Sequence, residues 1–91
     1  MYGLKSKTLT STGSVVSGPT RVVKLYLVGA SSAGSVVLKN GGSGGTTLFE
    51  MATPAGATLT QNIDFNDEGM RFETDLYVFF NQATHVEVLY A

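Results

Sequence analysis

The sequence predicts an all-β fold, an antiparallel, jelly-roll-like β-sandwich with about seven or eight short strands. Apolar runs are separated by clusters of Gly, Pro, Asn and Ser, at intervals near the roughly 8 to 12 residues that are typical of sandwiches and barrels. Apolar and polar residues alternate within several runs, as in strands with one buried face, and no window shows a convincing helical period. A chain of 91 residues is long enough for one such domain.

Turn clusters mark the ends of the expected strands. Within residues 21–28, Val23, Leu25 and Leu27 are expected on one face of the sheet, with Lys24 and Tyr26 on the other. The candidate segments, from which we expect about seven or eight strands to form, are residues 5–10, 14–17, 21–28, 35–39, 46–52, 57–65, 70–73, 76–80, 81–84 and 85–90.

Two later segments have clear local patterns. Residues 40–45 form a glycine-rich sequence, expected to be a flexible hairpin loop because Gly adopts positive φ at little cost. Residues 57–65 alternate almost ideally, with Leu59, Ile63 and Phe65 on the apolar side. That pattern predicts a half-buried strand.

The first twenty residues differ in composition from the rest. They are rich in Ser, Thr and Gly, and their low apolar content offsets little of the entropy of ordering. We therefore expect residues 1–20 to be an N-terminal arm or loosely ordered strands, and residues 21–91 to be the β-sandwich domain.

Residues 76–80 read Leu-Tyr-Val-Phe-Phe, an apolar strand without a polar face. In a sheet, Leu76, Val78 and Phe80 face one side and the two aromatic residues between them face the other, so one sandwich core cannot bury both sets. A weaker doubling of apolar residues occurs at Val22-Val23, Val36-Val37 and Leu48-Phe49.

This excess of apolar residues predicts an interface. If one set fills the core, the other forms an exposed patch larger than a small monomer usually carries, and a closed ring of identical subunits would cover it. The residues expected at this interface are Tyr26, Tyr77, Phe79, Val86, Val88 and Tyr90.

Charge and composition limit the classes of partner. Charged residues make up 14% of the chain, the formal net charge is −1, and the basic residues are scattered, so no basic stripe is available for a nucleic acid backbone. The sequence contains no Cys, which excludes disulfides and thiolate metal sites. No stretch approaches the roughly 18 apolar residues of a membrane span. We expect no nucleic acid partner, no membrane partner and no cofactor.

One segment resembles the start of a calcium-binding loop. It runs Asp-Phe-Asn-Asp-Glu-Gly from Asp64 to Gly69, and Asp75 falls at the twelfth position, where a bidentate acid would lie. However, Glu occupies the fifth position, Arg71 brings a cation into the loop, and the flanking segments are expected strands rather than helices. We therefore interpret it as a polar turn, with no metal.

The sequence gives no catalytic constellation. The glycine-rich residues 40–45 lack the Lys and Ser or Thr of a phosphate-binding loop, and His85, the single histidine, begins an expected strand. A glycosidase would need two acids across a cleft, and the candidate acids show no sign of converging. These acids are Glu50, Asp64, Glu73 and Glu87. We expect that the protein is not an enzyme.

Four segments together carry a resemblance to a known family. They are the Gly-Ser-Val-Val-Leu-Lys-Asn-Gly-Gly run at residues 34–42, Thr-Pro-Ala at 53–55, the run from Gly69 to Val78, and Val-x-Val-x-Tyr at 86–90. This combination resembles small β-sandwich virion structural proteins, of the head decoration type, from tailed and mostly marine bacteriophages. The resemblance covers residues 21–91 and rests on glycine and hydrophobic patterns.

The resemblance implies a non-enzymatic virion structural protein. The expected role is a capsid decoration or cement protein that binds between subunits of the major capsid protein, as a homotrimer because capsids offer threefold positions. Its expected location is the virion, assembled in the host cytoplasm. The alternative is a carbohydrate-binding or host-attachment module on a tail or fibre, with Tyr26, Tyr77 and Tyr90 as a stacking surface.

Overall fold

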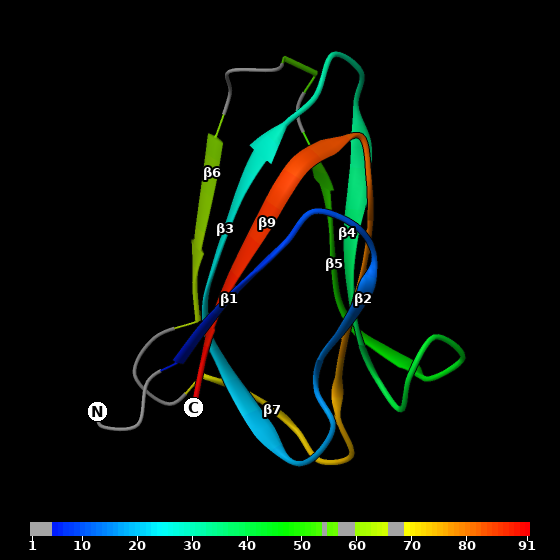
Figure 1. The fold of residues 1–91 in the computed structure, drawn as a ribbon, viewed down its shortest axis with the longest axis vertical. Helices are drawn as coiled ribbons and strands as arrows, with labels where there is room; N and C mark the ends of the chain where they lie inside the picture. The colour runs from blue at the N-terminus through cyan, green and yellow to red at the C-terminus, as the bar shows by residue number, and fades with distance from the viewer. Residues whose placement is uncertain (1–4, 54, 57–59, 66–68) are drawn as a thin grey trace.

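The computed structural model, which describes residues 5–53, 55–56, 60–65 and 69–91, confirms an all-β sandwich of two antiparallel sheets (Figure 1). Within that part of the chain there is no helix that could cross a membrane. The strands are β1 (Lys5–Leu9), β2 (Gly13–Val16), β3 (Thr20–Gly29), β4 (Gly34–Asn40), β5 (Thr46–Thr53), β6 (Thr60–Asp64), β7 (Met70–Phe72), β8 (Leu76–Asn81) and β9 (Ala83–Tyr90).

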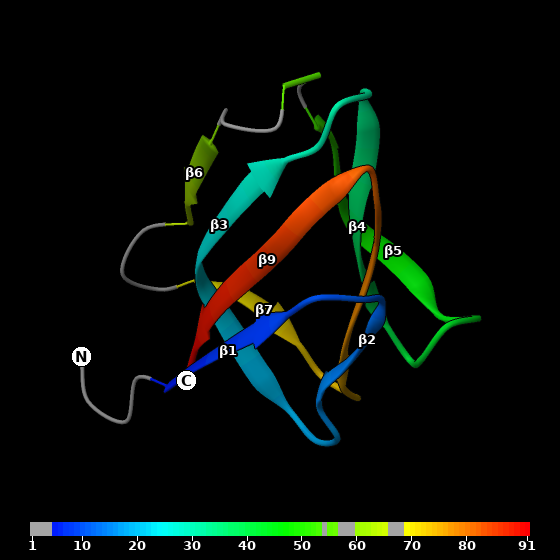
Figure 2. The same ribbon diagram turned by 45° about the horizontal axis from the view of Figure 1, so that its top comes forward.

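The strand order is that of a jelly roll. Sheet A has the order β1-β9-β3-β6, with β7 also paired to β3, and sheet B has the order β2-β8-β4-β5. If β6 and β7 count as one interrupted strand, the chain forms one long hairpin that turns between β4 and β5. In this hairpin β1 pairs with β9, β2 with β8, β3 with β6 and β7, and β4 with β5. Rolling this hairpin adds the β3–β9 and β4–β8 pairings, as Figures 1 and 2 show.

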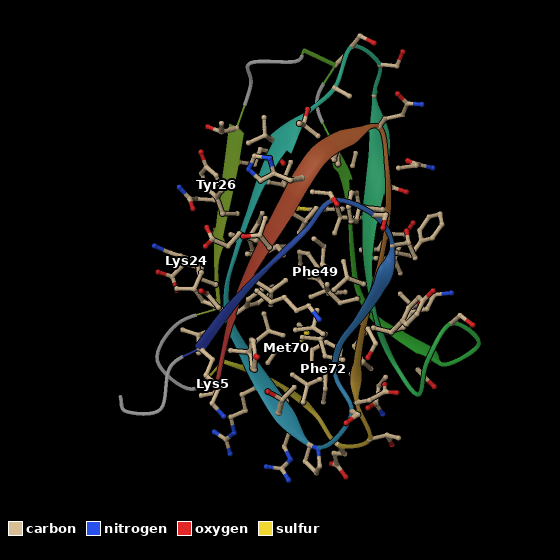
Figure 3. The ribbon with its side chains drawn as sticks, in the orientation of Figure 1. Lys5, Lys24, Tyr26, Phe49, Met70 and Phe72 are labelled. Carbon is tan, nitrogen blue, oxygen red and sulfur yellow. The ribbon has the colours of Figure 1, made fainter. Side chains whose placement is uncertain are left out.

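The core lies between the inner faces of the two sheets. Strand β8 alternates as expected, with Leu76 and Val78 fully buried and Phe80 nearly so. Figure 3 shows Phe49 and Phe72 pointing into the space between the sheets. The buried cluster consists of Leu9, Val22, Leu25, Leu27, Val36, Leu38, Phe72, Leu76, Val78, Phe80, Val86 and Val88.

Strand β3 departs from the expected alternation. Its pairing with β9 shifts register between Val22 and Lys24, so a β-bulge changes the phase of the side chains. Val22 lies inside before the bulge, and Leu25 lies inside after it. The expectation that Val23 faces the core with Leu25 is therefore wrong, because it assumed an unbroken period of two residues.

The beginning of β4 is fixed by a close backbone approach. The Gly34 N–H donates to Thr53 Oγ1 (2.8 Å), and the Ser35 N–H donates to Asn81 Oδ1 (2.9 Å). A Cβ on Gly34 would collide with the backbone oxygen and side chain of Asn81, so only glycine fits. Gln82, which follows Asn81 in the chain, has a φ of 54° and turns the chain from sheet B into sheet A.

At the other end of β4, two turns hold each other through reciprocal hydrogen bonds. Asp75 Oδ1 accepts from the N–H groups of Gly41 (2.7 Å) and Gly42 (3.1 Å). In return, Asn40 Oδ1 accepts from the N–H groups of Thr74 (2.8 Å) and Asp75 (3.3 Å). The glycine-rich hairpin is thus docked onto the turn between β7 and β8.

The described part of the first twenty residues is paired to both sheets. All of β1 is in register with β9, and β2 pairs with β8. Only Leu9 of β1 is buried; the other four residues of that strand are exposed. Just before β2, the Thr12 hydroxyl continues the pairing with β8. It accepts from the Phe80 N–H (3.0 Å) and donates to the Phe80 carbonyl (3.1 Å).

Two phenylalanines provide a matched test of this architecture. We expect Phe72→Ala to lower the free energy of unfolding by about 3 to 5 kcal/mol, because Phe72 is fully buried. Phe79→Ala removes the same atoms from a side chain that is 37% exposed, and we expect a cost of about 1 kcal/mol or less. Urea denaturation followed by circular dichroism measures both; equal losses would contradict this placement of the core.

The docked hairpin gives a second prediction. Asp75→Ala removes the acceptor of two backbone N–H groups and should lower the free energy of unfolding by about 1 to 3 kcal/mol. Glu73→Ala, at an exposed position in the same turn, is the control and should change it by less than about 0.5 kcal/mol.

Because Asp75 serves the turn, millimolar chelator should leave the melting temperature of the wild type unchanged. A lower melting temperature restored by calcium would show instead that the carboxylate holds a metal.

Candidate interaction surface

The residues expected at an interface do not lie together. Val86 and Val88 are fully buried, and Tyr90 is half-buried against the core. The expectation that these three residues form one exposed patch with Tyr77 and Phe79 is wrong. The reason is that β9 lies between β1 and β3, so its apolar face is the inner face of sheet A. The closed ring that this patch implied therefore loses its basis, and the homotrimer stays a prediction that rests on the resemblance to capsid decoration proteins.

The three tyrosines proposed as a stacking surface are also separated. Tyr26 lies opposite Glu87 and Asn62 on the outer face of sheet A (Figure 3). Tyr77 lies on the outer face of sheet B, and Tyr90 is directed to the core. No single face presents all three rings.

The outer face of sheet B carries the largest exposed apolar side chains of the described residues. Phe79 is 37% exposed and lies directly opposite Val37 on the neighbouring strand β4. Leu48 is 41% exposed and lies at the bulge in β5, between the inward Phe49 and Thr47, which is opposite Lys39. Tyr77 lies opposite Lys39. We call Val37, Leu48, Tyr77 and Phe79 the sheet B patch.

The rim of the sheet B patch is polar and carries one charge of each sign. Glu50 lies opposite Val37 on the β5 side, and Lys39 contributes one cation. The Lys39 ammonium group donates to the Ser43 carbonyl (2.9 Å), which directs it toward the hairpin loop. The Glu50 carboxylate adjoins Val37, so a partner that covers the patch must leave this group in water or pair it.

The outer face of sheet A has the opposite character. Lys24 lies opposite Asp64, and Tyr26 lies opposite Glu87, so charged groups are spread across the face. His85 is the third residue of β9, opposite Val28, and does not cap a strand end. This face has the composition of one that stays in water.

The described residues form neither a metal cluster nor a pocket. No group of three or more His, Cys, Asp or Glu residues within that part of the chain could hold a metal ion, and no cavity is found in it. Of the calcium-like segment, Asp64 ends β6 and Gly69 has φ of 73°, as in a turn, while residues 66–68 lie outside the described part.

Two members of the sheet B patch were missed as interface residues by sequence reasoning. Val37 and Leu48 each belong to a doubled apolar pair, Val36-Val37 and Leu48-Phe49. In each pair one residue faces the core and the other faces outward. The doubled apolar pairs indicate that one residue of each pair is left outside the core. They do not show which strands share a sheet, and therefore not which of these outer residues lie together.

Compared with known proteins, the chain matches no protein-family model and no curated protein sequence. Two solved structures are similar in fold. One is from Bacillus endospore appendages, described as a novel family of disulfide-linked pili, with a TM-score of 0.46 and 10% identity over 96% of this chain and 81% of that chain. The other is the virus-like particle of the extra small virus of the giant freshwater prawn Macrobrachium rosenbergii, with a TM-score of 0.42 and 13% identity over 99% of this chain and 79% of that chain. At these scores and identities, the two similarities carry no argument about what this chain does.

Proposed function

We propose that this protein is a non-enzymatic virion structural protein, a decoration or cement protein that binds subunits of the major capsid protein on the head of a tailed bacteriophage. The observation that carries the proposal is the sheet B patch, an apolar surface on the outer face of an otherwise complete jelly roll. Its exposed rings and aliphatic groups gain free energy when a second protein removes them from water.

Two of the four segments that resemble phage virion proteins contribute residues to this surface, Val37 and Tyr77, and in this way they support the proposal. Residues 34–42 contain β4, which lies under the patch, and the run from Gly69 to Val78 contains Tyr77 and leads into Phe79. The Asn40 and Asp75 hydrogen bonds join these two segments directly. These hydrogen bonds hold the ends of β4 and β8 together beside the patch.

Docking through a rigid sheet face suits a protein that stabilises a shell. The patch lies on the two central strands of sheet B, β8 and β4, and on the edge strand β5. Val37, at its centre, is only 8% exposed and is supported by the fully buried Val36 and Leu38 on either side of it in the chain. Such a face is preorganised, so that little conformational entropy is lost when it binds.

The alternative, a carbohydrate-binding module, receives less support from the geometry. Sugar stacking needs aromatic rings on one accessible surface, and Tyr26, Tyr77 and Tyr90 lie on the outer face of sheet A, the outer face of sheet B and the inner side of sheet A respectively. Only the patch aromatics, Tyr77 and Phe79, are neighbours in one strand, and they alternate with buried residues.

Co-sedimentation with purified phage heads tests the proposal. Wild-type protein should sediment with heads built from the major capsid protein of the encoding phage, and Phe79→Asp should weaken binding at least about tenfold, since it places a charge at the centre of a desolvated contact. Tyr26→Asp, on the outer face of sheet A, is the control and should bind like the wild type. Circular dichroism checks that both variants are folded.

Three results would contradict the proposal. Wild-type protein that does not bind heads would remove the decoration role. Loss of binding in Tyr26→Asp but not in Phe79→Asp would place the contact on sheet A. Binding to glycans on an array, without binding to heads, would favour the host-attachment module.

A further inference from the structure

One edge of the sandwich differs from the other edges. Strand β1 has five residues, two of them Lys, and β2 has four residues and a bulge. On the far side of sheet A, the edge is divided between the short strands β6 and β7. Strand β5 is the remaining edge, with eight residues and no proline. Natural sheets usually protect such edges with charges, prolines, bulges or short strands.

The protection on β5 is confined to its first half. A bulge interrupts the pairing with β4 between Leu38 and Lys39, next to Leu48. From Phe49 to Thr53 the pairing is regular, and the only charge in this stretch is Glu50. No strand of the described residues pairs with the other side of this stretch.

The side chains of this stretch also leave apolar surface uncovered. Phe49 and Met51 point inward and pack against the core, yet both are only half-buried because they lie at the edge of the sandwich. Phe65 closes part of this side, with its ring edge-to-face to Phe49 at 5.0 Å between centroids. A strand placed beside β5 would satisfy the free backbone groups and cover Phe49 and Met51 in one step.

We infer that two copies of this chain associate through antiparallel pairing of β5 with β5 of the partner, around a twofold axis at Met51. An antiparallel strand paired with itself makes the same contacts in both directions and closes after two copies. The regular stretch from Phe49 to Thr53 is centred on Met51, so this register uses all of it. The contact involves the edge and not the centre of the sheet B patch, and it is independent of the proposed binding to heads.

The side chains favour this register over an axis at Glu50 or at Leu48. Inward residues must lie opposite inward residues, so the axis passes through a residue and not between two. An axis at Glu50 would place two carboxylates opposite each other, which is destabilising. An axis at Met51 places Met51 against its equivalent and Glu50 opposite Ala52 of the second copy, on the outer face. An axis at Leu48 would involve the bulge.

Single cysteines test the register, because the natural chain contains none. Residues opposite each other in antiparallel strands have Cα atoms about 4.5 to 5.5 Å apart, within the range of a disulfide. Met51→Cys should therefore form a covalent dimer under mild oxidation, whereas Leu48→Cys, on the same strand, should remain monomeric on a non-reducing gel. An equimolar mixture of Glu50→Cys and Ala52→Cys should form the mixed dimer; both positions are exposed, so this pair does not depend on a core substitution.

Charge at position 52 tests the association without a covalent bond. Ala52→Lys faces Glu50 of the second copy twice and should tighten the dimer by roughly two- to thirtyfold in dissociation constant, whereas Ala52→Glu should weaken it by a similar factor. Sedimentation equilibrium measures both, and the melting temperature of the wild type should rise with protein concentration. Phe79→Asp, the variant that tests head binding, should leave the dimer unchanged, so failure of one idea is distinguishable from failure of the other.

Several results would overturn the inference. A wild type that sediments as a monomer at all concentrations would do so, as would a trimer or equal crosslinking of Met51→Cys and Leu48→Cys. A wild type that stays monomeric but pairs β5 with an extended segment of a capsid protein would show that another strand occupies this edge.

Discussion

The ladder between β3 and β9 is the interaction on which the rest of sheet A depends. Strand β3 pairs with β9 on one side and with both β6 and β7 on the other, so each strand of that sheet except β1 touches it directly. The bulge at Val23 lets one ten-residue strand serve both roles. Before the bulge β3 is paired with β7, and after it with β6. Without that change of phase, Val22 and Leu25 could not both face the core.

Sheet B is positioned by hydrogen bonds at the two ends of β4. At one end, Gly34 lies against Asn81 and donates to Thr53, and at the other, Asn40 and Asp75 exchange hydrogen bonds. These bonds join turns that are far apart in sequence. Because both ends of β4 are held by these bonds, the outward side chains of the strand are fixed in position. Val37, one of them, therefore presents a rigid apolar surface.

Much of the fold follows from local pattern. The alternation in 76–80 and the pattern of Ile63 and Phe65 assign faces, and both assignments are confirmed; Leu59 lies outside the described residues. Repeated short strands separated by turns favour a jelly roll, and the observed strand order confirms that class. Local pattern could not show that β9 is a central strand. A Val-x-Val-x-Tyr strand has the same period whether its apolar face meets a core or a partner, and only the pairing with β1 and β3 decides between them.

The rolled hairpin also decides the order in which the chain can fold. Among the described strands, only β4 and β5 are both consecutive in the chain and paired with each other. Leu25 lies opposite Ile63 on β6 and opposite Val88 on β9. Because β9 is the last strand in the chain, the pairing of β3 is complete only when Val88 has been synthesised. Such a high contact order places folding in the slow range, about milliseconds to seconds. The β4–β5 hairpin closes the shortest loop of the described pairings, and the remaining strands must be kept from foreign partners until the ninth strand arrives.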